Sequence, residues 1–121
     1  MASSSDDSAK AVELGFVDEL ETDELYRIRT HHYFLQGKVG GKPAWLSFKP
    51  LPPKEDLLCG VCSTPMCFLL QIYAPVEGKS EDCFHRSLFV FLCKNPECSK
   101  PNSNENFVVF RSQLPRVNEF Y

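Results

Sequence analysis

Cysteine is the residue that most constrains how this chain can fold. Six cysteines occur in 121 residues, and four of them form two close pairs, Cys59-x-x-Cys62 and Cys93-x4-Cys98. The chain starts MASSSDDSAK, where no basic stretch precedes an apolar one, so we expect no secretory signal and a reducing compartment. Paired cysteines in a reducing compartment bind metal more often than they form disulfides. The spacing therefore predicts a metal site.

The segments around the cysteines favour β-strands. Ten Phe, four Tyr and one Trp give a composition typical of sheet. Residues 67–74, 84–92 and 107–114 are rich in aromatic and β-branched side chains, and the first two are apolar on both faces, which predicts central strands. We also expect a short strand over 12–17 and a turn or two of helix within 18–25. The predicted fold is mainly β, a small α+β domain whose antiparallel sheet has a zinc-ribbon-like end.

An antiparallel hairpin would bring the two cysteine pairs together. If Ala74 lies opposite His85, then Cys93 falls opposite Met66, and both pairs arrive at the same end of the hairpin. Four converging thiolates form a tetrahedral site that suits one zinc ion and leaves no open position. We therefore predict a single structural Zn²⁺. The four candidate ligands are Cys59, Cys62, Cys93 and Cys98.

The two remaining cysteines differ in how well they could compete for the metal. Cys83 lies at the other end of the hairpin, roughly 30 Å from the site at the rise of an extended strand, and is expected to be a loop thiol. Cys67 also shows C-x4-C spacing with Cys62, so whether it replaces one of the four ligands stays open. A thioredoxin-like dithiol would need the first pair to open a helix, whereas Ser63, Thr64, Pro65 and a strand follow it here.

The charge of the chain is unevenly distributed. Its net charge is −3, yet residues 1–30 contain eight acidic and three basic side chains. This balance makes direct nucleic-acid binding unlikely, because that binding depends on clustered Lys and Arg, and it favours a basic protein partner. We expect a disordered acidic tail over 1–11 and a single zinc-stapled β domain over 12–121. No apolar run approaches the ~20 residues of a membrane helix, so no membrane partner is expected.

Catalytic motifs do not emerge from the sequence. It offers no Gly-rich phosphate loop and no nucleophile paired with a base, so we expect a binding protein rather than an enzyme. Two alternatives stay open: a zinc ribbon that binds nucleic acid, and a structural domain whose partner site lies in a missing C-terminal half.

Several longer motifs resemble one family. KVGGKPAWL, LCGVCSTPMCFLLQIYAP, FHRSLFVFLCKNPEC and VVFRSQLPRVNEFY, with VELGF near the start, are similar to the N-terminal half of programmed cell death protein 2 and its relatives. The resemblance covers roughly residues 12–121 and extends to the related small-subunit ribosomal-protein chaperone of yeast. It places the family's metal-binding cysteines on the same four candidate positions.

The resemblance implies a function. Members of this family act in the cytoplasm and nucleus as dedicated chaperones of one basic small-subunit ribosomal protein and support maturation of the small ribosomal subunit. The implied client carries an Arg/Gly-rich extension, and the acidic first quarter of this chain would suit it. The resemblance also implies a longer family protein with a C-terminal half. We expect a monomer, while the residues that contact the client stay unknown.

Overall fold

The computed structural model describes residues 14, 16, 19–30, 37–76, 78 and 80–120. The predicted acidic tail over 1–11 and most of the predicted strand over 12–17 lie outside these residues. Within them the elements are α1 (Thr22–Thr30), β1 (Lys38–Val39), β2 (Cys67–Tyr73), β3 (His85–Leu92) and β4 (Phe107–Leu114), joined by short 3-10 turns η1 (Lys54–Leu57), η2 (Glu81–Cys83) and η3 (Pro96–Cys98).

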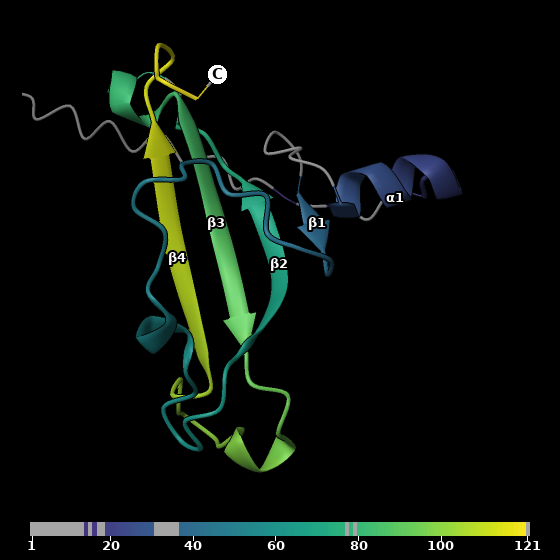
Figure 1. Ribbon diagram of the computed structural model, residues 1–121, viewed down its shortest axis with the longest axis vertical. Helices are drawn as coiled ribbons and strands as arrows, with labels where there is room; N and C mark the ends of the chain where they lie inside the picture. Colours follow the sequence, from purple (N-terminus) through teal and green to yellow (C-terminus); the bar gives the residue numbers. More distant parts are fainter. Residues whose placement is uncertain are drawn as a thin grey trace, which may run out of the picture.

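The strands form one antiparallel sheet in the order β1-β2-β3-β4. This confirms the predicted fold class, mainly β with little helix, and places β2 and β3 centrally as their apolar composition indicated (Figure 1). β1 has only two residues and pairs Lys38 with Gln71 and Val39 with Leu70. The turn that follows it needs glycine, because Gly40 and Gly41 have φ angles of 74° and 76°.

The register of the central hairpin agrees with the prediction at one end only. Cys67 pairs with Leu92 and Phe68 with Phe91, as predicted, and this is the cysteine end. A β-bulge between Phe68 and Leu70 inserts one residue, so that Tyr73 pairs with Ser87 beyond it. The predicted pairing of Ala74 with His85 is therefore wrong by one residue, and the Ala74 N–H donates instead to the Arg86 carbonyl at 2.8 Å.

One face of the sheet carries the core. The connector over residues 42–58 crosses this face, and its Leu46 is fully buried with Phe89, Phe91 and Leu114. Trp45 packs its ring on that of Phe89 at a centroid distance of 4.6 Å, so the indole joins the core. A buried hydrogen bond also fixes the connector, because the Ala44 N–H donates to Oε1 of Gln71 at 2.8 Å.

The helix α1 differs from the prediction. A turn or two was expected within 18–25, whereas α1 begins at Thr22 and extends over nine residues. Asp23 and Glu24 lie in its first turn, where carboxylates interact favourably with the helix dipole. The helix lies to the side of β1, away from β3 and β4 (Figure 1). None of the helices in the described residues is long and apolar enough to cross a membrane.

Candidate metal centre

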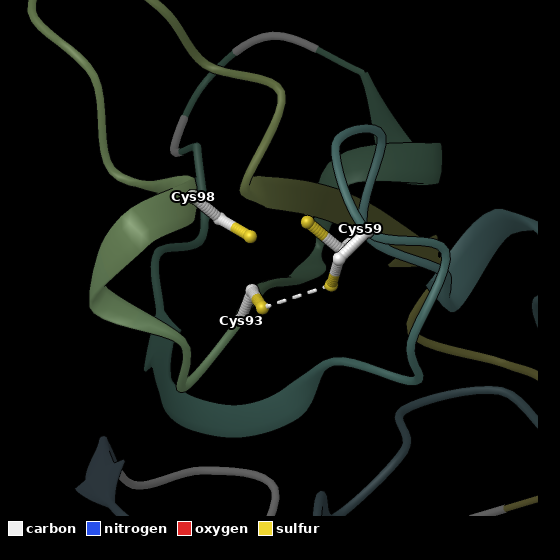
Figure 2. A group of neighbouring side chains, drawn as sticks. Cys59, Cys93 and Cys98 are labelled. Atoms are coloured by element: carbon white, nitrogen blue, oxygen red, sulfur yellow. Dashed lines mark hydrogen bonds between the residues drawn. The ribbon is translucent and has the colours of Figure 1, made fainter.

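Four thiols meet at the end of the sheet where β2 begins and β3 ends. The Sγ atoms of Cys59, Cys62, Cys93 and Cys98 all lie within 4.8 Å of one another. Three of these side chains are buried, and only Cys62 is exposed. Figure 2 shows the thiols of Cys59, Cys93 and Cys98 directed toward one another from two loops. The structure thus brings together all four cysteines that the sequence singled out.

The first loop is a tight knuckle. The Ser63 N–H donates to the Cys59 carbonyl, and the Cys59 N–H donates to the Thr64 carbonyl, both at 2.9 Å. Ser63 adopts a φ of 56°, which reverses the chain direction after the second cysteine. The Val61 N–H points at the sulfur of Cys59, 3.4 Å away, where it would stabilise a thiolate.

The second loop presents its cysteines through a 3-10 turn. β3 ends at Leu92, so Cys93 follows directly, and η3 then delivers Cys98. The Asn95 side chain caps this turn by accepting a hydrogen bond from the Glu97 N–H at 3.1 Å. Asn95 and Pro96 thus explain why a spacing of four residues, rather than two, still closes on the same site.

A third segment, which the sequence analysis missed, holds the two loops together. The carbonyl of Glu105 accepts from the Gly60 N–H, and the carbonyl of Asn106 accepts from the Cys93 N–H, each at 2.8 Å. A Cβ on Gly60 would lie 3.0 Å from the Glu105 carbonyl oxygen, so this glycine is needed for close approach. These contacts use backbone atoms, so apart from Gly60 no residue type in the sequence pointed to them.

The sulfur geometry fits a tetrahedral ion. Sulfurs bound at about 2.3 Å to a tetrahedral zinc lie about 3.8 Å from one another. The Cys62 and Cys93 sulfurs are 3.7 Å apart, much farther than the ~2.05 Å of a disulfide. All four positions around such an ion would be filled by protein, with no side open to a substrate. The donor set is therefore compatible with a structural metal.

Three of the clustered thiols differ in their acidity. Hydrogen bonds from the side chain and backbone of Thr64 lower the pKa of the Cys62 thiol to about 6. Burial, together with the neighbouring cysteines, raises the pKa of Cys98 to about 12. A backbone hydrogen bond at Asn95 lowers the pKa of Cys93, but burial and the thiols of Cys62 and Cys59 outweigh it and leave that pKa raised. Four thiolates this close would repel one another, and a divalent cation would remove that cost.

The other two cysteines lie outside the cluster. Cys67 is the first residue of β2 and does not join the four thiols. Its C-x4-C spacing from Cys62 had left it as an alternative metal ligand. Cys83 belongs to η2 at the opposite end of the hairpin, where Nε2 of Gln113 lies 3.4 Å from its sulfur. Its expected position far from the site is confirmed.

The acidic side chains before and within α1 are a second candidate site. They are exposed to solvent, and no hydrogen bond among the described residues engages them through their carboxylates. The four that the structure describes are Glu19, Glu21, Asp23 and Glu24. They form an accessible anionic surface at one side of the sheet.

Comparison with known proteins gives one consistent result. The sequence matches the family described as "Programmed cell death protein 2, N-terminal domain" over residues 11–121. It is 47% identical to programmed cell death protein 2 of Bos taurus over 115 residues, which cover 95% of this chain and 30% of that protein. It is 38% identical to programmed cell death protein 2-like of Homo sapiens over 82 residues, or 68% of this chain and 21% of that protein.

A more distant relative comes from fission yeast. The probable 20S rRNA accumulation protein 4 of Schizosaccharomyces pombe is 39% identical over 66 residues, which cover 54% of this chain and 16% of that protein. No solved structure matches the chain. The chain thus spans about a third or less of the length of these relatives. The match over residues 11–121, which includes all four clustered cysteines, shows that the chain belongs to the programmed cell death protein 2 family.

Proposed function

We propose that this domain is a zinc-stapled binding module and not an enzyme. The observation that carries this proposal is the closed set of four thiols, three of them buried. Catalytic zinc sites keep one position open for water or substrate, whereas sites with four protein ligands stabilise the fold. The bound ion would hold the two cysteine loops at the end of the sheet and would supply no chemistry to a substrate.

The proposed ion is Zn²⁺, with Cys59, Cys62, Cys93 and Cys98 as its ligands. Thiolate sulfur favours zinc over magnesium, calcium or manganese, and four sulfurs in a tetrahedron suit it best. The protein should therefore purify with one zinc per chain, as measured by elemental analysis together with native mass. A protein that is folded when free of metal, and that takes up no added zinc, would contradict this part of the proposal.

The proposed partner is a basic small-subunit ribosomal protein. The resemblance to the family implies such a client, and the name of the Schizosaccharomyces pombe relative refers to a ribosomal RNA. The exposed acids near α1 support it, because anionic surface attracts and neutralises a basic, Arg-rich segment. We propose that the domain acts as a dedicated chaperone that shields this segment, as a monomer, in the cytoplasm and also in the nucleus.

Native mass spectrometry of the chain co-expressed with the ribosomal protein tests both parts. A one-to-one complex that contains one zinc would support both a structural zinc site and a client-binding site within these 121 residues. A zinc-loaded chain that never binds the ribosomal protein would refute the proposed client for this domain, while the proposed zinc site would stand. Co-expression with an unrelated basic protein of similar charge is the control for nonspecific attraction.

A further inference from the structure

The two faces of the sheet are covered very differently. Along β3, Ser87, Phe89 and Phe91 point toward the connector and are at most 4% exposed. The residues between them, Leu88, Val90 and Leu92, point to the opposite face and are only half-buried. We call this opposite side the open face.

Strand pairing arranges the open face in apolar rows. Val39, Leu70, Val90 and Val109 align across all four strands, and the two at the ends are 65% and 49% exposed. Ile72 and Leu88 continue the face toward one end, and Cys67, Leu92 and Phe107 continue it toward the cysteine cluster. Ile72 is 48% exposed and Phe107 42%, so nothing in the described part of the chain covers these rows.

An apolar sheet face of this extent indicates a protein partner. A sheet is normally stabilised by covering each apolar face with another layer, and monomeric proteins rarely leave a large contiguous apolar patch in water. Isolated exposed hydrophobic residues are common, but here they are contiguous across four strands and share one face. The open face therefore has the properties of an interaction surface.

The charges on this face are all of one sign. Arg111 aligns with Leu88 and Ile72, and Arg86 lies diagonally beside it on the same face, opposite Gln113. The Nε–H of Arg86 donates to the Ala74 carbonyl at 2.6 Å, which holds the side chain at this end of the sheet. Among the described residues, no carboxylate belongs to the rows of the open face, although the chain as a whole has a net charge of −3.

These charges narrow the choice of occupant. Covering Arg111 with an apolar layer alone would desolvate a guanidinium without an anion, which is costly. A second copy of this chain would bring only arginines and apolar residues to the contact. An occupant with carboxylates in register with the arginines would gain charge-assisted hydrogen bonds together with apolar burial.

We propose that the open face docks an apolar segment of another protein that carries carboxylates opposite Arg86 and Arg111. This surface is distinct from the acidic residues near α1 and opposite to them in sign. The inference is therefore independent of the ribosomal client: a basic extension would meet the acids, and an acidic apolar segment would meet the open face.

Fluorescence anisotropy with two designed peptides tests this inference on the zinc-loaded 121-residue chain. One labelled probe is an amphipathic helix of Leu and Glu, and the other has the same pattern with Lys in place of Glu. We expect the Leu/Glu peptide to bind at least about tenfold more tightly at low salt. Arg111→Glu should reverse this preference. Lys54→Glu makes the same charge change in η1 of the connector, which belongs to no row of the open face, and should leave the preference intact.

A second measurement does not depend on any variant. In a heteronuclear NMR titration of the unsubstituted chain, the Leu/Glu peptide should shift the amides of Val39, Leu70, Val90 and Val109. Equal affinity for the two peptides, shifts confined to other surfaces, or a preference that Arg111→Glu leaves unchanged would each overturn the proposal. It would also fail if the chain forms a dimer that Val109→Ser disperses, because a second copy would then occupy the face.

Discussion

The Cys62 thiol is the exposed one of the four clustered thiols, and it differs in acidity from Cys93 and Cys98. It is exposed, and hydrogen bonds from Thr64 lower its pKa to about 6, which favours the thiolate over the thiol near neutral pH. Cys98 is buried, and its pKa is raised to about 12. Metal binding must therefore drive a proton from Cys98 but not from Cys62. We expect Cys62 to capture the ion first and the buried thiols to close around it.

Replacing Thr64 by valine tests the acidity of Cys62. The Thr64 hydroxyl lies 3.2 Å from the Cys62 sulfur, and valine keeps the shape while losing this hydrogen bond. The pKa of Cys62 should then rise from about 6 toward its ordinary value. In the metal-free chain, iodoacetamide should alkylate Cys62 more slowly at pH 7 than in the parent, because only the thiolate reacts.

Mass spectrometry of the alkylated chain, across a series of pH values, measures the rate at each cysteine. The alkylation rate of Cys83 serves as the internal reference, because that thiol lies outside the cluster. An unchanged pH profile at Cys62 in Thr64→Val would contradict the role of the hydroxyl.

Serine substitutions distinguish the cysteines that bind the metal from those that do not. Cys98→Ser removes a buried sulfur ligand, so we expect zinc content to fall from one per chain to near zero and the chain to fold poorly. Cys83→Ser and Cys67→Ser should keep the zinc, because both thiols lie outside the cluster. Elemental analysis gives the zinc content, and circular dichroism on heating reports the fold. Equal damage from Cys83→Ser or Cys67→Ser would mean that the ligand set is wrong.

At the scale of elements, β3 carries the core on one face and the open surface on the other. Phe89 is fully buried, whereas Leu88, its neighbour in sequence, is half-buried on the open face. Phe89→Ala should lower the free energy of unfolding by about 3–5 kcal/mol, the usual range for a buried Phe. Leu88→Ala should cost clearly less than the ~2–5 kcal/mol of a fully buried Leu.

Urea denaturation of the zinc-loaded chain measures both changes. Similar losses in the two variants would show that the open face is covered in solution. The comparison therefore also bears on whether the docking surface is free in the isolated chain.

Apolar pattern and turn residues were enough to predict the sheet but not its details. The aromatic and β-branched run over residues 84–92 predicted β3, and the predicted pairing with its partner strand is correct at the metal end. The bulge after Phe68 was not predictable, because an inserted residue in a uniformly apolar run leaves no break in the pattern. Buried Gln71 was also missed, since its role depends on a hydrogen bond to Ala44, distant in sequence.

The four-cysteine site was more predictable than the segment that supports it. Two close cysteine pairs at the ends of adjacent strands must converge once the hairpin forms, and this convergence survives an error of one residue in register. The residues that join the loops, Glu105 and Asn106, act through carbonyl groups, which every residue possesses. Their placement depends on where β4 begins, and that is a property of the whole sheet.

At the scale of the whole molecule, two surfaces of opposite charge lie on different parts of the chain. Exposed acids precede and begin α1, beside β1, whereas the arginines lie on the open face toward β3 and β4. A net charge of −3 hides this separation, since opposite charges cancel in the sum. If a basic client binds at α1, its attraction should depend mainly on the acidic surface there.

Reversing the acidic surface tests its role in client binding. The variant replaces four exposed acids by lysine, namely Glu19, Glu21, Asp23 and Glu24. We expect the affinity for the basic ribosomal protein to fall by at least about tenfold at low salt, as several exposed pairs are lost together. The loss should shrink as salt rises, because screening weakens the attraction in the parent. Isothermal titration calorimetry at two salt concentrations measures both effects.

The matched control reverses four exposed acids elsewhere on the chain, so that the net charge changes equally. These are Glu55, Asp56, Glu81 and Glu119. If the site is local to α1, the control should lose much less affinity than the variant, and both should keep their zinc. Equal losses of affinity in the variant and the control would mean that client binding depends on the net charge of the chain and not on the acids near α1. Unchanged affinity in both variants would exclude an electrostatic basis for client binding by this domain.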